Sequence, residues 1–348
     1  MAANLSPEYK DAQEAYRRAR DPKERLECLR EMLRTIPKHK GTDHLQADIK
    51  RRIKELSEEL EGPRKGGGRS GPSVAIRPEG AAQVALLGPP NTGKSSLHAR
   101  LTGSHAVIGP YPFATKVPLP GMLIHEDVHF QLVDLPPISA DYMEPWMANA
   151  LESADAALLV VDLSEPDCVE QVAAIRRRLE EKRITLIEDS DREPAPDAGP
   201  DDQGSGSEAV ADPFRLRFPT AVVASKCDRL NDPEAELDAF RDLAGLGARA
   251  LAVSAEDGHG LSRIGPLLFQ MLGVVRVYTK VPGHQPARDG RPFTLRGDVT
   301  VRDVAHLVHR GQAAQLRFAR IWGSGEFDGQ QVSGDHPVRD RDVVELHW

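Results

Sequence analysis

Short apolar runs alternate with helical patterns through the middle of the chain, and this alternation predicts a mainly parallel α/β sheet. Each run is bounded by polar or turn-forming residues, as buried strands usually are. Between the runs, residues 169–182 and 234–243 carry the apolar spacing of helices. The candidate strands are Gln83–Leu87, Met122–Glu126, His129–Val133, Ala157–Val161, Ala221–Ala224 and Ala250–Val253.

Apolar residues in the first 65 positions recur at helical spacing and predict an N-terminal helical hairpin over residues 7–61. Pro37 closes the first long pattern, and Asp43 with Gln46 resembles a capping box for the next. That second pattern is a narrow stripe which needs an apolar partner. We expect its sister helix to be that partner, with the next domain or another protein as alternatives.

Two stretches lack the apolar residues that a folded segment requires. Residues 66–79 are rich in Gly, Pro and Ser near their start and predict a flexible linker between the N-terminal domain (1–65) and a central domain (80–273). Residues 188–213 are strongly acidic and contain almost nothing apolar, which predicts a disordered surface loop within that central domain.

The last 75 residues, 274–348, predict a small α+β module. Thr300 can cap a helix with Asp303 three residues later, and Val301, Val304, Leu307 and Val308 would form the buried face of that helix. Residues 316–321 and 343–346 read as closing strands.

Composition narrows the class of protein. The chain has 348 residues, 40% hydrophobic and 28% charged, with a formal net charge of −8 that is concentrated in an acidic centre between mildly basic ends. Basic ends permit contact with nucleic acid but do not establish it. The three cysteines form no C-x-x-C pair, and no segment resembles a signal peptide or a membrane span. We therefore expect a cytoplasmic protein with no membrane partner.

The candidate chemistry centres on residues 86–97, which read L-L-G-P-P-N-T-G-K-S-S-L. Gly88, Gly93, Lys94 and Ser95 fit G-x-x-x-x-G-K-[ST], between a predicted strand and a predicted helix. Backbone N–H groups of such a loop cradle phosphates, the lysine lies near the β- and γ-phosphates, and the serine hydroxyl binds Mg²⁺. Asn91, Thr92 and Ser96 complete the predicted phosphate-binding set.

Four further elements follow in the order that a guanine-nucleotide switch requires. Thr115 in Y-P-F-A-T-K can reach Mg²⁺, and Asp134 follows a strand and can hold the metal through water. In S-K-C-D at 225–228, the Asp228 carboxylate can accept hydrogen bonds from guanine N1–H and from the exocyclic amine. The aliphatic stem of Lys226 can lie across the base, and Ser225 precedes it in the motif. A backbone N–H of Ser254 or Ala255 can bond guanine O6. Together the five elements predict a P-loop domain that binds guanine nucleotides.

These motifs, with Pro-Gly at 120–121 and I-W-G-S-G and D-H-P-V-R-D-R-D-V-V-E-L near the end, resemble the Obg-related, developmentally regulated GTP-binding proteins. The resemblance implies a C-terminal TGS domain of the ubiquitin-like β-grasp type. It implies GTP binding with Mg²⁺ and slow hydrolysis, in which Lys94 and Thr115 take part, and a role linked to ribosomes or translation. It also implies that Asn91 helps to coordinate K⁺.

Three positions depart from the family pattern. Pro137 replaces the glycine whose N–H contacts the γ-phosphate, and proline has no N–H. Ser225 replaces an asparagine that braces the phosphate loop, and a hydroxyl can substitute in part. Ala114 replaces the first of two switch threonines. In addition, Ile138 lies where many GTPases place a water-orienting glutamine, although relatives in this family are also apolar there.

The sequence is compatible with three functions. The first is a slow GTPase, assisted by a partner because no residue is an obvious water-positioner. The second is a guanine-nucleotide-binding scaffold with negligible hydrolysis, suggested by Pro137. The third is a ribosome- or RNA-binding module that uses the N-terminal hairpin and the C-terminal domain, with a structural nucleotide. We expect no DNA partner.

Overall fold

A computed structural model of the chain describes residues 6–19, 21–37, 42–61, 76–104, 117–188, 214–288, 290–309 and 311–348. Thr115 and Ala114, most of the predicted linker and residues 189–213 of the predicted acidic loop lie outside these ranges. The chain forms two compact units, one of Met1–Ala75 with Pro194–Leu216 and the other of Ile76–Glu193 with Arg217–Trp348.

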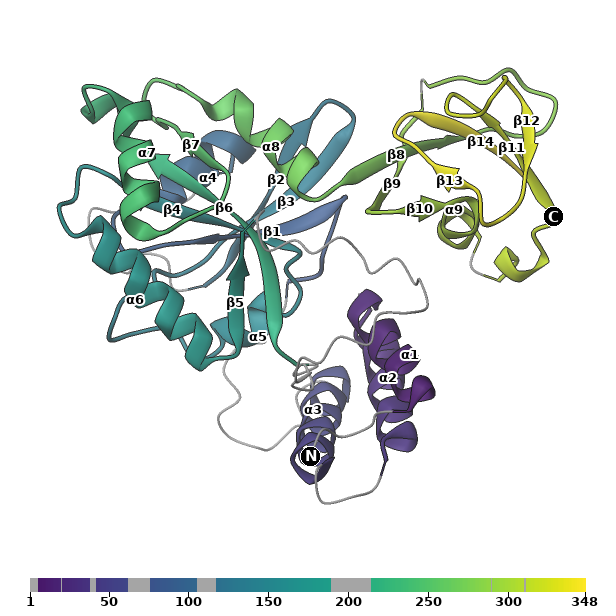
Figure 1. Cartoon of the computed structure of the whole chain (residues 1–348), viewed down its shortest axis with the longest axis horizontal. Coiled ribbons are helices and arrows are strands. Elements are labelled where there is room, and N and C mark those ends of the chain that lie inside the picture. The colour runs from purple at the N-terminus through teal and green to yellow at the C-terminus, as the bar shows by residue number, and fades with distance from the viewer. Residues whose placement is uncertain are drawn as a thin grey trace, which may run out of the picture. The chain divides into compact units, whose positions relative to one another are not determined.

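The described part of the first unit contains the helices α1 (Pro7–Arg18), α2 (Pro22–Thr35) and α3 (Asp43–Glu61), purple to blue in Figure 1. The hairpin expected from the sequence therefore has a third helix. The break between α1 and α2 arises because the Asp21 carboxylate accepts from the N–H of Lys23 at 2.8 Å, and Pro22 occupies the first helical position. The prediction of a hairpin over residues 7–61 did not include this cap.

The core of the first unit is small and mostly helical, formed by Tyr9, Ala12, Tyr16, Leu29, Met32, Ile36, Ile49 and Phe214. Phe214 comes from a distant part of the chain. Its ring meets that of Tyr16 edge-on, with centroids 6.2 Å apart, and the Arg52 guanidinium lies 4.4 Å from its centroid. The apolar stripe of α3 thus packs on its sister helices, as expected, and also on a residue that follows the acidic segment.

The second unit begins with a seven-stranded sheet. The path of the sheet is β2-β3-β1-β4-β6-β5, and β7 pairs with β6. The β1–β3, β1–β4, β4–β6 and β6–β7 pairs are parallel, and β2–β3 is an antiparallel hairpin. Its strands are β1 (Ala82–Leu87), β2 (Leu119–His125), β3 (Val128–Asp134), β4 (Ala156–Asp162), β5 (Ile184–Ile187), β6 (Leu216–Ser225) and β7 (Ala250–Ala252).

Helices cover this sheet and complete its core. α4 and α8 pack on one face, where Leu97, Ile264 and Leu268 join buried residues of β1, β3, β4 and β6. α6 packs beside β4 and β5, and α7 beside β7 (Figure 1). The helices are α4 (Lys94–Thr102), α5 (Met147–Leu151), α6 (Cys168–Glu181), α7 (Pro233–Ala244) and α8 (Ile264–Met271), with 3₁₀ turns η3 (Cys227–Arg229) and η4 (Leu261–Arg263).

A mixed five-stranded sheet of order β12-β11-β14-β8-β9 forms the C-terminal module, with β10 and β13 as a separate pair. The central β14–β8 pair is parallel and the other pairs of this sheet are antiparallel. The elements are β8 (Val274–Thr279), β9 (Phe293–Arg296), β10 (Val299–Thr300), α9 (Val301–Val308), η5 (Ala313–Gln315), β11 (Phe318–Trp322), β12 (Gln330–Val332), β13 (Pro337–Val338) and β14 (Asp342–His347).

Helix α9 packs on this sheet and begins at the capping box expected from the sequence. The Asp303 carboxylate accepts from the N–H of Thr300 at 2.9 Å and from its hydroxyl at 2.7 Å. Val301 and Val304 are buried as expected, but Leu307 and Val308 are 47% and 37% exposed. The expectation for these two was wrong, because the helix ends at Val308 and its last turn lies beyond the core.

None of the helices in the described ranges combines the length and the apolar composition that crossing a membrane requires.

Asp303→Ala removes the two bonds that the Asp303 carboxylate accepts from Thr300, so we expect the C-terminal module to lose about 1 kcal/mol of stability. Urea denaturation followed by tryptophan fluorescence measures this loss, because Trp322 and Trp348 both lie in the module. Asp298→Ala, at an exposed position before the helix, serves as the control. Equal midpoints for the two variants would contradict the prediction.

Candidate functional site

The loop between β1 and α4 depends on backbone conformations that few side chains permit. Gly88 and Gly93 have φ values of +150° and +81°, and a Cβ on Gly88 would lie 2.2 Å from the carbonyl oxygen of Val160. Asn91 also has a positive φ of 61°, which asparagine tolerates better than most residues. At Gly93 the loop enters α4, whose first N–H groups lack partners within the helix. The loop is therefore built to bind an anion.

Lys94 is the buried cation of this loop. Its ammonium donates to the carbonyl oxygens of Gly88 at 3.0 Å and Pro89 at 2.6 Å. Burial lowers the pKa of Lys94 from 10.5 to about 8, and the nearby Asp134 carboxylate opposes that shift. The Thr92 hydroxyl also donates to the Pro89 carbonyl, at 3.1 Å, so it stabilises the loop from within.

Ser95 and Asp134 meet at the end of β3. Parallel pairing places Asp134 opposite Leu86 of β1, and the Ser95 hydroxyl donates to the Asp134 carboxylate at 2.6 Å. A hydroxyl and a carboxylate side by side are the oxygen donors that Mg²⁺ prefers. These two residues therefore fit the metal that the sequence predicted. Ser96 follows in the first turn of α4.

Two residues at the end of β6 connect it to the phosphate loop. The Ser225 hydroxyl donates to the carbonyl oxygen of Thr92 at 2.5 Å, with the carbonyl of Val161 at 3.0 Å as a second acceptor. The Lys226 ammonium donates to the carbonyl oxygen of Asn91 at 2.6 Å. The serine at 225 thus reaches the loop that the family's asparagine was expected to brace.

Asp162 is a site residue that the sequence analysis missed. It ends β4 and is 2% exposed, and its carboxylate accepts from Lys226 at 2.7 Å and from the Ser164 hydroxyl at 2.6 Å. Burial opposes its ionisation, but these hydrogen bonds hold the pKa of Asp162 below its usual value. The signal was present, because an Asp directly after a buried strand is the pattern that identified Asp134.

The remaining predicted residues lie where β6 and β7 end. The Cys227 N–H donates to the carbonyl of Val253 at 3.1 Å, which holds the exposed Asp228 near Ser254. The Ser254 N–H donates to the carbonyl of His259 at 3.0 Å, and its hydroxyl accepts from the N–H groups of Glu256 and Asp257. Ser254 therefore shapes the turn that presents Ala255.

The segment after Asp134 turns back onto the phosphate loop. Pro137 and Ile138 are buried, and the Ile138 N–H donates to the carbonyl of Gly88 at 3.1 Å. The first N–H after the proline is therefore directed to the loop backbone. The buried Ile138 side chain has no polar atom with which to orient a water molecule.

The predicted residues thus meet at the carboxyl edge of the β3-β1-β4-β6-β7 strands, where ligands of parallel α/β sheets usually bind. Thr115 is outside the described residues, so its place at this edge stays a prediction.

Comparison with known proteins gives two family matches. The family described as "50S ribosome-binding GTPase" matches residues 83–189, and the TGS domain matches residues 275–347. Relatives align along most of both chains. An uncharacterised GTP-binding protein of Methanocaldococcus jannaschii is 26% identical over 93% of this chain and 92% of its own. Another from Halobacterium salinarum is 28% identical over 93% and 98%, and developmentally-regulated G-protein 1 of Arabidopsis thaliana is 27% identical over 91% and 88%.

The chain is similar over most of its length to the developmentally regulated GTP-binding proteins. The resemblance seen in the sequence is confirmed, and so is the combination of a P-loop GTPase domain with a C-terminal TGS domain. The assignments of Mg²⁺, K⁺ and individual site residues stay predictions.

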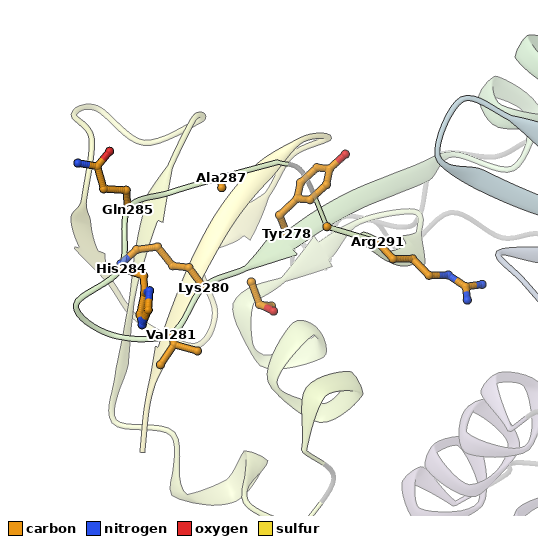
Figure 2. A pocket seen from close by; sticks show the side chains of 9 residues that line it. Tyr278, Lys280, Val281, His284, Gln285, Ala287 and Arg291 are labelled. Atoms are coloured by element: carbon orange, nitrogen blue, oxygen red, sulfur yellow. The ribbon is translucent and has the colours of Figure 1, made fainter.

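A cavity of about 320 Å³ lies away from this site, in the TGS domain. Figure 2 shows Tyr278, Lys280, His284 and Arg291 around it. Lys280 is already paired with Glu345 and lies 4.4 Å from the centroid of the Trp322 ring. Among the residues that the structure describes, none from the nucleotide motifs lines this cavity.

We expect Ser225→Ala to weaken GDP binding about fivefold, because one buried hydrogen bond to the phosphate loop is worth ~1 kcal/mol. Titration with a fluorescent GDP analogue measures the change. Ser333→Ala, an exposed serine of the TGS domain, is the control. Unchanged affinity of the Ser225 variant would show that the hydroxyl does not hold the loop for nucleotide.

The lowered pKa of Lys94 predicts how GDP binding depends on pH. Phosphates favour the ammonium form, so a chain whose Lys94 pKa is about 8 must take up a proton to bind above that pH. GDP affinity should fall by up to about tenfold per pH unit above pH 8. By the same linkage, the contribution of Lys94 to the free energy of unfolding rises as the pH goes from about 8 to 10.5. In this range the unfolded chain holds more protons than the folded chain.

Lys94→Arg provides the comparison, because its guanidinium keeps its charge across this range. Affinities measured from pH 7 to 9 should slope for the wild type and stay level for the variant. Parallel slopes would assign the pH dependence to another group.

Proposed function

We propose that the chain binds GTP and GDP with Mg²⁺ and hydrolyses GTP slowly. The observation that carries this proposal is the double contact of Lys226, whose ammonium reaches both the Asn91 carbonyl at 2.6 Å and the Asp162 carboxylate at 2.7 Å. One side chain thereby connects the phosphate loop to the segment that carries Asp228. A binding site for base and phosphates together requires this connection.

On this proposal the phosphate end is held by charge and by backbone N–H groups. Lys94 turns from its two carbonyl partners to the β- and γ-phosphates, and the N–H groups at the start of α4 bind the β-phosphate. Ser95 and Thr115 would hold Mg²⁺, and Asp134 would hold it through water. The metal, when bound, neutralises charge on the transferring phosphoryl group. Asn91 contributes to a K⁺ site beside the phosphates.

The base end selects guanine through Asp228. Its exposed carboxylate accepts from guanine N1–H and from the exocyclic amine, whereas adenine offers an acceptor at the corresponding ring nitrogen. The stem of Lys226 lies along the base. Because the Ser254 N–H already donates to His259, the Ala255 N–H is the donor of that pair for guanine O6.

Slow turnover follows from the segment after Asp134. Ile138 is buried and apolar, so catalysis rests on Lys94 and the metal rather than on a positioned water. A partner that supplies a water-positioning or charged group would accelerate the reaction.

The proposed partner is the ribosome or its RNA. Its support is the description of the matched family, 50S ribosome-binding GTPase, together with the TGS domain and the mildly basic chain ends.

Phosphate release from GTP by the purified chain, in KCl and in NaCl, tests the main proposal. We expect slow release that rises in KCl and is lost in Lys94→Ala, since the lysine stabilises the transferring group. Asn91→Ala should remove the potassium effect, so that its release is the same in KCl and in NaCl. Release that survives Lys94→Ala would point to a contaminating enzyme and contradict the proposal.

A guanine-nucleotide-binding scaffold without hydrolysis is the second candidate, favoured by Pro137. This residue is buried and cannot donate to a γ-phosphate. If it uncouples the switch, wild-type GDP and GTP affinities are equal and no phosphate is released. Pro137→Gly should then favour GTP over GDP by about fivefold, the worth of one hydrogen bond of ~1 kcal/mol.

A further inference from the structure

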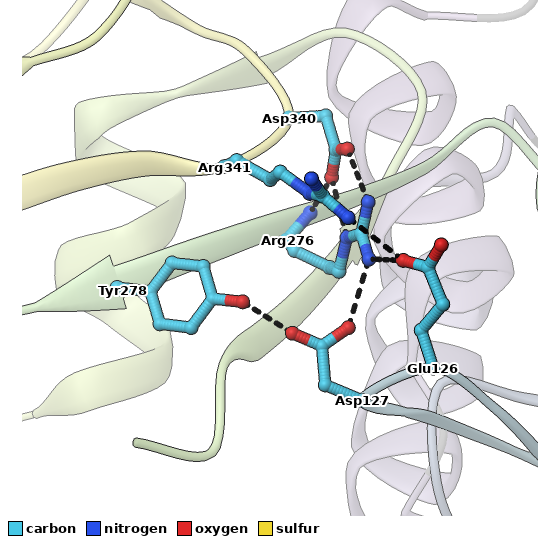
Figure 3. Close-up of polar contacts among 6 residues, drawn as sticks. All are labelled: Glu126, Asp127, Arg276, Tyr278, Asp340 and Arg341. Carbon is cyan, nitrogen blue, oxygen red and sulfur yellow. Dashed lines mark hydrogen bonds and ion pairs between the residues drawn. The ribbon is translucent and has the colours of Figure 1, made fainter. Parts of the chain in front are cut away.

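The guanidinium of Arg276, in β8 of the TGS domain, is bonded to three carboxylates (Figure 3). It donates to Asp340 of its own domain at 3.0 Å from Nε and 2.7 Å from Nη2. Its Nη1 donates to Asp127 at 2.8 Å and also to Glu126. The Arg276 side chain is only 6% exposed, whereas the side chains of Glu126, Asp127 and Asp340 are 50%, 33% and 34% exposed. The arginine end of each bond is therefore buried. Bidentate bonds of arginine to carboxylate, such as those to Asp340, are among the stronger polar contacts in proteins.

Glu126 and Asp127 are the two turn residues between β2 and β3 of the GTPase domain. Two more TGS side chains hold the same turn: the Tyr278 hydroxyl donates to Asp127, and Arg341 donates to Glu126 at 2.9 Å. Glu126 has a positive φ of 51°, a conformation that a glutamate rarely adopts without support. The TGS domain therefore holds the side chains of both turn residues.

Helix α8 closes the contact from the GTPase side. A Cβ on Gly265 would lie 2.8 Å from the His125 ring, so β2 and α8 are in close contact just before the turn. Phe269 of α8 meets the His125 ring edge-on, with centroids 6.0 Å apart. The Arg276 guanidinium lies 4.8 Å from the centroid of that same Phe269 ring. One aromatic side chain thus lies between the strand and the arginine.

The other end of the same hairpin carries part of the nucleotide site. β2 and β3 pair without interruption from His125 opposite Val128 to Leu119 opposite Asp134. A strand of this length spans about 20 Å. At the turn, the hairpin is held by Arg276; at the far end, Asp134 accepts from the Ser95 hydroxyl at 2.6 Å. A continuously paired hairpin transmits displacement from one end to the other, because its interstrand bonds resist slippage.

We infer that Arg276 is a positioning residue for the nucleotide site: by binding the β2–β3 turn it fixes the hairpin that places Asp134, so that displacement of the TGS domain promotes nucleotide release. The inference rests on the proposed binding of guanine nucleotide. Binding linkage makes the coupling reciprocal, so nucleotide must strengthen the hold of the TGS domain on the turn by the same factor. If Arg276 is removed, the carboxylates of Glu126, Asp127 and Asp340 face one another with less compensating charge. Their repulsion would then open the contact.

Dissociation of a fluorescent GDP analogue from the full-length chain is the first measurement. We expect Arg276→Ala to accelerate dissociation about fivefold or more, the lower end of couplings between linked sites. Arg302→Ala is the matched control, because Arg302 forms an exposed pair with Asp335 at 3.1 Å in the same domain and touches no part of the turn. Its dissociation rate should equal that of the wild type.

Tyr278→Phe tests the same contact with less risk to folding, since it removes only the hydroxyl that donates to Asp127. It should accelerate dissociation in the same direction by a smaller factor. Arg276→Lys should lie between the wild type and Arg276→Ala, because one ammonium cannot bond all three carboxylates in the geometry of a guanidinium.

Amide hydrogen exchange supplies a readout that a merely structural role would leave unchanged. In the wild type, GDP should slow exchange in residues 125–128, and this effect should be absent in Arg276→Ala. Wild-type dissociation rates in both Arg276→Ala and Tyr278→Phe would overturn the inference while leaving nucleotide binding intact. A wild-type chain that binds no GDP would overturn the proposed function and the inference with it.

Discussion

The ammonium group of Lys226 connects three strands that are far apart in the sequence. It lies between the Asn91 carbonyl, in the loop after β1, and the Asp162 carboxylate at the end of β4, while its own backbone leaves β6. These strands are neighbours in the order β1-β4-β6, so their carboxyl ends meet at one edge. A parallel sheet brings the ends together, and a partly buried ion pair then fixes their spacing. The ion pair and the strand order are both needed, because neither alone would place the segment that carries Asp228 against the phosphate loop.

Sequence reasoning worked best where chemistry and local conformation coincide. The phosphate loop could be identified because its glycines, its lysine and its flanking strand and helix all lie in the single stretch from Ala82 to Thr102. The capping box at Thr300 and Asp303 was predictable for the same reason. The break between α1 and α2 was not predicted although Asp21 and Pro22 mark it, because residues 7–61 were interpreted as a hairpin of two helices.

Contacts between distant segments were harder to predict. Asp162 follows a strand as Asp134 does, but its partner Lys226 lies 64 residues away, and only the strand order brings the two together. The exposure of Leu307 and Val308 depends on how far the sheet of the TGS domain extends under α9, which periodicity does not report. The carboxylates around Arg276 come from positions 126, 127 and 340, and in the sequence each is one acid among many.

Phe214 has a consequence for the order in which the chain folds. The helices of the first unit are synthesised first, yet a buried ring of their core belongs to residue 214. Strands β1 to β5 are therefore made before the N-terminal unit can complete its core. During synthesis, the helices retain an unfilled apolar site until that ring arrives. Deletion of residues 1–75 would also leave Phe214 without its partners, so the N-terminal helices are not a detachable extension of the GTPase domain.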